Sequence, residues 1–385
     1  MIYLDNAAST WPKPKEVSRA MVEAVENYAA NPGRGGHRLA QKASQVVNET
    51  RRNLAALFHV QDSNSIVFQT NATAAINQAL FGLQWKEGDH VISTSLEHNS
   101  VRRPLEKLKD AYGVQTTYLD LKPNEEIKPD DICPYITEHT KLIACTHMSN
   151  LTGQVMPVSL LGQLADEHNL LFLVDASQSA GYLPIDVEEL KIDLLAFPGH
   201  KGLYGPQGTG GLYVSPRVTL TPLLHGGTGR FSEDVNMPGQ MPERLEAGTL
   251  NTPGIAGLGE GVRFILNEGI DKIQQHEAGL TTYALRQLND MSGIAVYGPT
   301  VDVPRGPVIA FNIKGVHSHE VAHILNDYYG VAVRAGMHCT PLAHHAHGTE
   351  RTGALRISFS YFNRTEEVDH FIDALMEIKE GLLGE

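Results

Sequence analysis

The sequence has few cysteines and no long apolar run. Its three cysteines are Cys133, Cys145 and Cys339. An odd and small number excludes a disulfide framework and fits a reducing compartment, so we expect a cytoplasmic protein. No apolar run approaches the ~20 residues that span a bilayer, and the first five residues lack the basic and apolar parts of a signal peptide. We therefore expect no membrane association.

Basic residues are scarce relative to acidic ones. Lysine and arginine together number 31 against 44 aspartates and glutamates, which gives a formal net charge of −13. Proteins that bind nucleic acid usually present a basic surface, so this balance argues against a nucleic-acid partner. Hydrophobic residues make up 42% of the chain, which is ordinary for a globular protein with a sizeable core.

Apolar periodicity predicts an α/β fold. Short, nearly continuous apolar runs at 66–68, 90–93, 142–145 and 170–174 are typical of strands buried on both faces. Helical spacing is present at Val17, Met21, Val25 and Tyr28, at Val46, Thr50, Leu54 and Leu57, and across 159–168. Strands that alternate with helices predict a large domain with a mostly parallel sheet over 15–262.

The pattern changes after about residue 262. Strand-like runs at 308–312, 331–333 and 355–358 surround a helix-like segment at 317–329. A final helix is predicted with Val368, Phe371, Leu375 and Leu382 on one face. These elements predict a smaller α+β domain formed by 1–14 and 263–385. No Pro- or Ser-rich linker separates the two domains, so we expect them to pack closely.

Asp175 lies at the end of the apolar run 170–174, where open α/β sheets bind ligands. A buried carboxylate there needs a cationic partner, and a protonated pyridine nitrogen is such a partner. Aspartate and serine are also favoured at helix N-termini, so capping alone explains the segment equally well.

Lys201 follows Gly199 and His200, 26 residues after Asp175. The apolar run 194–197 just before it indicates a buried lysine rather than a surface one. Burial lowers the pKa of an amine and makes it nucleophilic, which suits a Schiff base. The chain contains no G-x-x-x-x-G-K-[ST] string, so this is not a Walker A loop.

Two further strand ends carry polar residues. The segment 70–77 follows a strand and opens a helix, and the free N–H groups of a helix N-terminus favour phosphate. Capping by Asn71 or Thr73 explains the same residues. His98 follows the run 90–93, where a neutral imidazole can stack on an aromatic cofactor and move protons. A lone histidine is more often structural.

In chain order these strand ends carry a phosphate-type turn, a histidine, an Asp-x-x-Gln motif and a Gly-His-Lys motif. The order resembles the class V aminotransferase group of fold-type I pyridoxal 5′-phosphate (PLP) enzymes. Within that group it is most similar to the short-loop cysteine desulfurases and selenocysteine lyases. The resemblance begins at Tyr3-Leu4-Asp5-Asn6-Ala7-Ala8 and continues past Arg356. It implies the PLP-dependent transferase fold of type I, with a mostly parallel mixed sheet and a smaller α+β domain.

The resemblance also implies how the cofactor is held. Lys201 would carry PLP, and Asp175 would pair with its pyridine nitrogen. Further implied contacts are Gln178 to the phenolic oxygen, His200, Thr73 and the Ala72 backbone to the phosphate, His98 stacked on the ring, Asn150 near cofactor and substrate, and Thr249 to the phosphate in the second subunit. The last contact implies a homodimer with shared active sites. Pro198 departs from the family pattern, because relatives often carry a phosphate-binding serine there.

The segment 333–344 resembles the Arg-x-Gly-x-His-Cys loop of the desulfurases, which implies that Cys339 accepts sulfur. Its Gly, His, Thr and Pro neighbours indicate a loop. A buried structural thiol, the usual state of a free cysteine, is the alternative. Cys145 lies within an apolar strand and Cys133 precedes Pro134, so both are interpreted as structural.

For the substrate, the resemblance implies that the planar fork of Arg356 grips a carboxylate. Arg334 would be a second active-site arginine, with His37 near the pocket entrance and Ala8 in the substrate site. The implied reaction converts L-cysteine to L-alanine, leaves a persulfide on Cys339, and passes the sulfur to an acceptor protein. Lys201 would be the base, assisted by His98.

Alternatives to this function remain open. L-selenocysteine is a possible substrate, and a class V transaminase or epimerase would not need Cys339. A non-catalytic sulfur-assembly role is disfavoured by the intact set of Asp175, His200 and Lys201. A metal site is suggested by the histidine-rich segment 338–347, but its spacing matches no usual zinc pattern, so we expect no metal.

Overall fold

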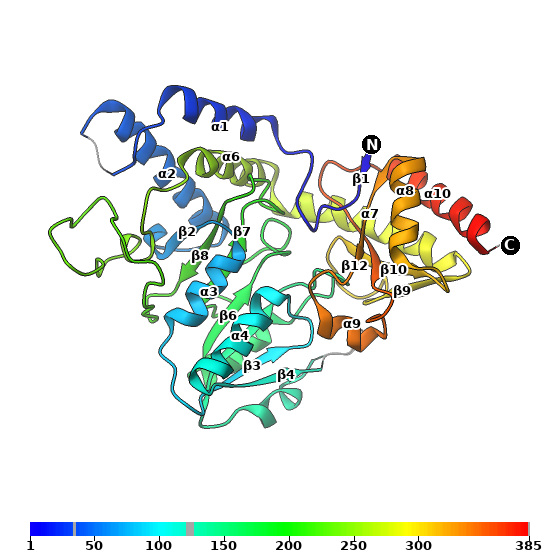
Figure 1. Ribbon diagram of the computed structural model, residues 1–385, viewed down its shortest axis with the longest axis horizontal. Coiled ribbons are helices and arrows are strands. Elements are labelled where there is room, and N and C mark those ends of the chain that lie inside the picture. Colours follow the sequence, from blue (N-terminus) through cyan, green and yellow to red (C-terminus); the bar gives the residue numbers. More distant parts are fainter. Residues whose placement is uncertain (34–35, 121–126, 384–385) are drawn as a thin grey trace.

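A seven-stranded sheet organises the larger part of the chain (Figure 1). The structure is a computed structural model that describes residues 1–33, 36–120 and 127–383. In spatial order the strands are β2 (Ile66–Gln69), β8 (Gly210–Val214), β7 (Leu194–Pro198), β6 (Leu171–Asp175), β5 (Thr140–Thr146), β3 (His90–Thr94) and β4 (Gln115–Leu119). Only β8 runs antiparallel to its neighbours, so the predicted mostly parallel sheet is confirmed.

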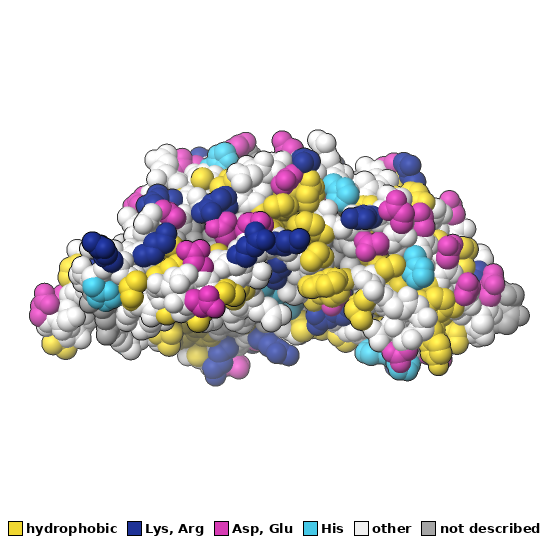
Figure 2. Space-filling model, turned by 90° about the horizontal axis from the view of Figure 1, so that it is seen from above, with side chains coloured by type: hydrophobic (Ala, Val, Ile, Leu, Met, Phe, Trp, Pro, Cys, Tyr) yellow, Lys and Arg dark blue, Asp and Glu magenta, His cyan; other side chains and the backbone are white. Residues whose placement is uncertain are grey.

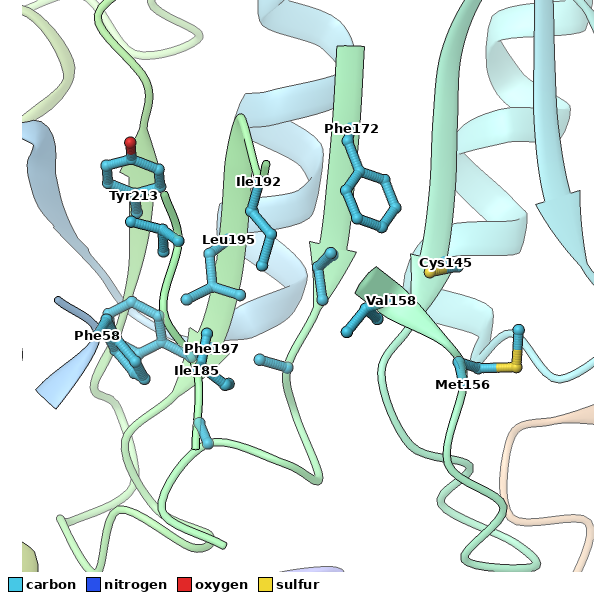
Figure 3. Packing of buried hydrophobic residues seen from close by; sticks show 14 of the residues in the cluster. Phe58, Cys145, Met156, Val158, Phe172, Ile185, Ile192, Leu195, Phe197 and Tyr213 are labelled. Atoms are coloured by element: carbon cyan, nitrogen blue, oxygen red, sulfur yellow. The ribbon is translucent and has the colours of Figure 1, made fainter. Parts of the chain in front are cut away.

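Successive residues of these strands are buried on opposite faces of the sheet. On β6, Phe172 and Val174 join one apolar cluster, and Leu173 joins another. The first cluster includes residues of the helices α2 (Arg38–Leu57), α5 (Val158–Glu167) and α6 (Thr252–Glu268). The second includes residues of the helices α3 (Ala72–Gly82) and α4 (Asn99–Tyr112). Figure 3 shows Phe172, Leu195 and Tyr213 projecting from neighbouring strands into the first cluster. Helices therefore cover both faces, which explains the continuous apolar runs in the sequence.

The helices of this part are α1 (Lys15–Asn27), α2 (Arg38–Leu57), α3 (Ala72–Gly82), α4 (Asn99–Tyr112), α5 (Val158–Glu167) and α6 (Thr252–Glu268). The three predicted helices, α1, α2 and α5, are confirmed. One detail is wrong, because Val25 is 59% exposed. The buried face of α1 contains Val17 and Ala24, with the buried Tyr28 just after its end, and the small Ala24 lets α1 approach α6 closely.

The smaller part carries both chain ends (Figure 1). Its antiparallel sheet has the order β12 (Arg334–Gly336), β13 (Ala354–Ser358), β10 (Val308–Ile313) and β9 (Ile294–Tyr297), and a parallel pair joins β1 (Ile2–Tyr3) to β11 (Val331–Ala332). Its helices are α7 (Ile270–Asp290), α8 (Ser318–Tyr329), α9 (Pro341–His347) and α10 (Thr365–Leu383). The predicted strands and helices are confirmed, but Leu382 is 36% exposed and lies outside the apolar face of α10.

A separate apolar cluster supports the predicted second domain. It is built from Leu4 and from residues between Leu280 and Ile378. The predicted boundary at 262 falls inside α6, which continues to Glu268 and meets α7 at Gly269. The division into 15–262 and 1–14 with 263–385 stays a prediction.

Charges of both signs are mixed on the surface seen in Figure 2, and hydrophobic side chains gather near its middle. Large exposed apolar residues include Trp11, Leu224 and Val235, the last of them fully exposed.

Gly162 in α5 is expected to tolerate no side chain. A Cβ atom there would lie 2.0 Å from the carbonyl oxygen of Leu190. Gly162→Ala should therefore destabilise the protein by about 1–3 kcal/mol, as overpacking typically does. Gly279→Ala in α7, where a Cβ meets nothing within 4 Å, should instead stabilise by up to about 1 kcal/mol. Urea unfolding measures both, and equal effects would contradict the packing argument.

Candidate active site

A cavity of about 240 Å³ opens where the parallel strands end. Thr146, Asp175 and Pro198, the last residues of β5, β6 and β7, all line it. Ligands of open α/β sheets bind at this edge. The predicted site residues that line the cavity are Ala8, Ala72, Thr73, His98, Asn150, Asp175, Gln178, His200, Lys201, Arg334 and Arg356.

Lys201 and Asp175 bring opposite charges into the cavity. Burial lowers the pKa of the Lys201 amine to about 8, although the Asp175 charge acts in the opposite direction. Asp175 is 2% exposed, and its Oδ1 accepts hydrogen bonds from the Ser177 backbone N–H, at 2.9 Å, and from the Ser177 hydroxyl. Its Oδ2 has no hydrogen-bond partner in the described part of the chain. One carboxylate oxygen is thus free to meet a cationic ligand.

Another part of the cavity wall is suited to an anion. Asn71 caps α3 by accepting a hydrogen bond from the Ala74 N–H at 2.9 Å, and Thr73 lies in the first turn. The N–H groups and dipole of this helix end favour negative charge. His200 Nδ1 is buried without a partner among the described residues, and burial is the main reason that the His200 pKa falls to about 4. Pro198 also lines the cavity, and it has no hydroxyl to offer a phosphate in place of the serine that relatives often carry.

Arg356 is 1% exposed and is held on two sides. Its Nη2 forms an ion pair with Asp5 Oδ1 at 2.7 Å, and its Nη1 donates to the Asn150 carbonyl at 2.9 Å. Its Nε is buried and has no partner among the described residues. Arg334 pairs with Arg356 across β12 and β13. The fixed guanidinium keeps donors for a further carboxylate, and the second arginine adds positive charge beside it.

His98 is the N-cap residue of α4. Its Nδ1 accepts a hydrogen bond from the Ser100 backbone N–H at 3.0 Å and lies 2.8 Å from Ser100 Oγ. Burial lowers the pKa of the imidazole to about 4, so the ring is neutral at pH 7. Gln178 also lines the cavity, and its Nε2 donates to the Ala7 carbonyl at 3.1 Å.

Cys339 is exposed and does not line the cavity, but its neighbour His338 does. Both residues have left-handed backbones, with φ values of 59° and 47°, so other contacts must hold the turn. Asn150 Nδ2 donates to the His338 carbonyl, and the Asn99 N–H donates to the Cys339 carbonyl, each at 2.8 Å. The predicted loop is confirmed, and the turn is tied to two sides of the cavity.

Of the other two cysteines, Cys145 is buried, as interpreted from its apolar strand, and Cys133 is half-buried. His37 and Thr249 do not line the cavity. His37 caps α2 through a hydrogen bond from the Ala40 N–H at 3.4 Å, and Thr249 Oγ1 accepts from Asn31 Nδ2 at 3.2 Å. A single chain does not bring these two predicted residues into the site.

Sequence reasoning missed Glu97, which is fully buried directly before His98. Its Oε1 accepts hydrogen bonds from Thr94 Oγ1 at 2.6 Å and from the Thr146 N–H at 3.0 Å. Burial raises the pKa of this carboxyl to about 8, and the nearby Asp175 charge raises it too. An acid after an apolar strand is visible in the sequence, but spacing alone does not distinguish it from a surface residue. Asp5, Ser100 and Ser177 were also missed, because their spacing does not distinguish them from surface residues either.

The fold and this arrangement define the class of protein. The sequence matches the family described as Aminotransferase class-V over residues 2–371, and the chain belongs to that family. A probable cysteine desulfurase of Methanothermobacter thermautotrophicus is 37% identical over 382 residues, covering 98% of this chain and 94% of that protein. A probable cysteine desulfurase of Pyrococcus abyssi is 36% identical, covering 99% of this chain and 95% of that protein.

Two solved structures of cysteine desulfurases have a similar fold. The apo structure of a cysteine desulfurase from Thermococcus onnurineus NA1 matches with a TM-score of 0.93 at 35% identity, covering 99% of this chain and 95% of that one. The cysteine desulfurase CsdA of Escherichia coli matches with a TM-score of 0.88 at 29% identity, covering 98% and 94%. The predicted family and the type I fold are confirmed.

No helix in 1–33, 36–120 or 127–383 is long and apolar enough to cross a membrane. Within the same ranges, no group of three or more His, Cys, Asp or Glu residues is placed to hold a metal ion, and the histidine-rich segment 338–347 forms none.

Glu97→Gln should flatten the pH dependence of stability. The folded-state pKa of about 8 exceeds the usual 4.5, so the native protein keeps a proton that the unfolded chain loses. Stability therefore falls as pH rises from about 4.5 to about 8, and the amide removes this contribution. Urea unfolding between pH 5.5 and 8 measures the slope. The variant should keep a shallower slope, because Glu277 remains and burial raises its pKa to about 8 as well. The exposed Glu16→Gln control should match the wild type, and an unchanged slope in Glu97→Gln would contradict the assignment.

Proposed function

We propose that this chain is a PLP-dependent cysteine desulfurase that converts L-cysteine to L-alanine and leaves a persulfide on Cys339. One observation carries the proposal: a single cavity holds Lys201, Asp175 and Arg356, and the turn that bears an exposed thiol borders it through His338. The names of the similar proteins support the same activity.

The residues of the cavity fit PLP. The Lys201 amine, whose pKa burial lowers to about 8, suits covalent attachment of an aldehyde. The free Oδ2 of Asp175 suits a protonated ring nitrogen, and the α3 N-terminus with Thr73 and the unpartnered Nδ1 of His200 suits a phosphate. When bound, PLP would supply an electron sink for negative charge that develops at the α-carbon of an amino acid.

The chain's own residues then divide the work on the substrate. Arg356 binds the carboxylate through its remaining N–H donors, and Arg334 adds positive charge beside it. This places the α-carbon near Lys201, whose Nζ can take the α-proton once the amine is free. Asn150 joins the substrate-binding arginine to the turn that bears Cys339. Its backbone carbonyl accepts a hydrogen bond from Arg356, and its side-chain amide donates one to the His338 carbonyl.

Cys339 completes the reaction as a nucleophile. Its thiolate attacks the substrate sulfur, so that an S–S bond forms and the Cβ–S bond breaks. The electron pair of the broken bond stays with Cβ, which takes up a proton and becomes the methyl group of alanine, while Lys201 returns the α-proton to the α-carbon. The thiol is exposed and outside the cavity, so the 337–340 turn must swing inward for attack and outward for delivery. An acceptor protein would then remove the terminal sulfur.

A homodimer would explain the two residues that a single chain leaves outside the site. Thr249 and His37 would reach the cavity of the second subunit, where Thr249 would contact the phosphate. The exposed apolar residues Leu224, Phe231 and Val235 precede Thr249 in the chain and suit a covered surface. The three free cysteines fit the proposed cytoplasmic location.

Lys201→Ala tests cofactor attachment. Borohydride treatment of the PLP-loaded wild type should fix the cofactor to the chain, because the bond to Nζ is reduced to a stable amine, and mass spectrometry of the intact protein detects it. The Lys201→Ala variant should gain no mass, whereas Lys272→Ala, at an exposed lysine of α7, should behave as the wild type. A full adduct on Lys201→Ala would place the cofactor elsewhere.

Cys339→Ala tests the sulfur step. Incubation with L-cysteine should give alanine at a rate lower by on the order of 100-fold or more, because the nucleophile is gone while substrate binding is intact. The change in cofactor absorbance on adding cysteine should persist. Cys133→Ala, which removes a half-buried thiol outside the cavity, is the control. Alanine, sulfide and protein persulfide are measured, and undiminished alanine formation in Cys339→Ala would favour another class V activity.

A further inference from the structure

A run of three polar side chains connects the anion-binding side of the cavity to the imidazole of His98. Thr73 Oγ1 lies 2.7 Å from Ser100 Oγ, which lies 2.8 Å from His98 Nδ1. All three residues line the cavity. They come from the first turn of α3 and from the beginning of α4, so two helix N-termini meet at this point.

The direction of these hydrogen bonds follows from the backbone. The Ser100 N–H donates to His98 Nδ1 at 3.0 Å, and an amide N–H can only donate. Nδ1 therefore carries the lone pair, and the single proton of a neutral ring is on Nε2. The Ser100 hydroxyl then donates to Nδ1 as well, and it accepts from the Thr73 hydroxyl.

Burial and nearby positive charges keep the ring neutral. Burial is the largest cause that lowers the His98 pKa, and Lys201, Arg334 and Arg103 act in the same direction. Asp175 alone opposes them. A neutral imidazole has one nitrogen that donates a hydrogen bond and one that accepts. Ser100 already bonds to the accepting nitrogen, Nδ1.

We infer that Ser100 is a positioning residue that fixes His98 as the Nε2–H tautomer and so makes the imidazole a hydrogen-bond donor toward the cavity rather than a base. The inference rests on the proposed function in that the cavity holds the cofactor and substrate. His98 Nε2 makes no hydrogen bond to a described residue, so its proton is available to an acceptor atom of a ligand. Proton abstraction is left to Lys201.

The same run links the phosphate side to the ring. When the Thr73 hydroxyl turns to a bound phosphate, Ser100 loses the donor on its oxygen but keeps its own bond to His98. Anion binding and the orientation of the imidazole therefore share one serine hydroxyl, and removal of that hydroxyl disturbs both.

The test uses holoenzyme labelled with ¹⁵N-histidine. His98→Gln assigns the His98 signals, and couplings between ring nitrogens and ring protons identify the tautomer between pH 6 and 8. We expect a bare Nδ1 and a protonated Nε2. In Ser100→Ala the Nδ1 resonance should shift because one of its two donors is gone, and Ser100→Thr should restore it. A proton on Nδ1 in the wild type, or an unshifted resonance in Ser100→Ala, would overturn the inference.

Ser318→Ala is the matched control. Ser318 is the first residue of α8 and follows His317, another N-cap histidine whose Nδ1 accepts a backbone N–H, at 3.4 Å. Its hydroxyl donates to the Thr352 carbonyl at 2.8 Å, so its removal should leave the His98 signals unchanged.

Steady-state kinetics provide a second measurement. Ser100→Ala should lower kcat for L-cysteine by about tenfold with KM within about twofold, because a misplaced donor affects the reaction more than binding. Ser100→Thr should recover most of the rate, and a change in KM alone would contradict a positioning role. If the wild type does not consume cysteine, the proposed function fails, while the tautomer measurement still decides the inference.

Discussion

The site depends on an amine and a carboxylate that share one cavity without neutralising each other. Burying either charge costs free energy, because the charge loses its contacts with water. A charged ligand in the cavity would offset this cost, since both groups face the space that it fills. Several other ionisable groups near this pair carry no charge. The histidines of the cavity wall have lowered pKa values, and Glu97 behind Asp175 has a raised one, so all are neutral near pH 7. The ion pair of Arg356 with Asp5 leaves Arg334 as the remaining strong charge.

The sheet could be predicted from the sequence wherever both faces of a strand are covered. The runs that became β2, β3, β5 and β6 are apolar at consecutive positions, and burial on alternating faces requires that. The polar edge strand β4 has no such pattern, since it is half-buried and has one neighbour. The two-residue strand β1 and the three-residue strand β12 are too short for any periodicity. Val25 was misplaced because helical spacing alone does not show whether Val25 or the adjacent Ala24 faces the core, and Leu382 was misplaced because the buried face of α10 ends at Ile378.

The site was predictable where a motif sits directly on a strand end. Lys201 and Asp175 follow apolar runs, so their place at one edge of the sheet follows from parallel strands. The contacts of Arg356 with Asp5 and of Asn150 with His338 join residues far apart in the chain, and no local pattern contains them. The same holds for the turn at Cys339, whose backbone conformation is maintained by hydrogen bonds from residues 99 and 150. Long-range hydrogen bonds of this kind are visible only once the chain is folded.

The first eight residues connect the two parts of the molecule. Leu4 belongs to the smaller apolar core, Asp5 holds Arg356, and Ala7 accepts from Gln178 while its N–H donates to Ser358 Oγ. On a ribosome, the N-terminal segment emerges first but finds its partners only after β13 has been synthesised. The cavity therefore forms only after β13 has been made, and residues 4–7 must stay without these partners until then.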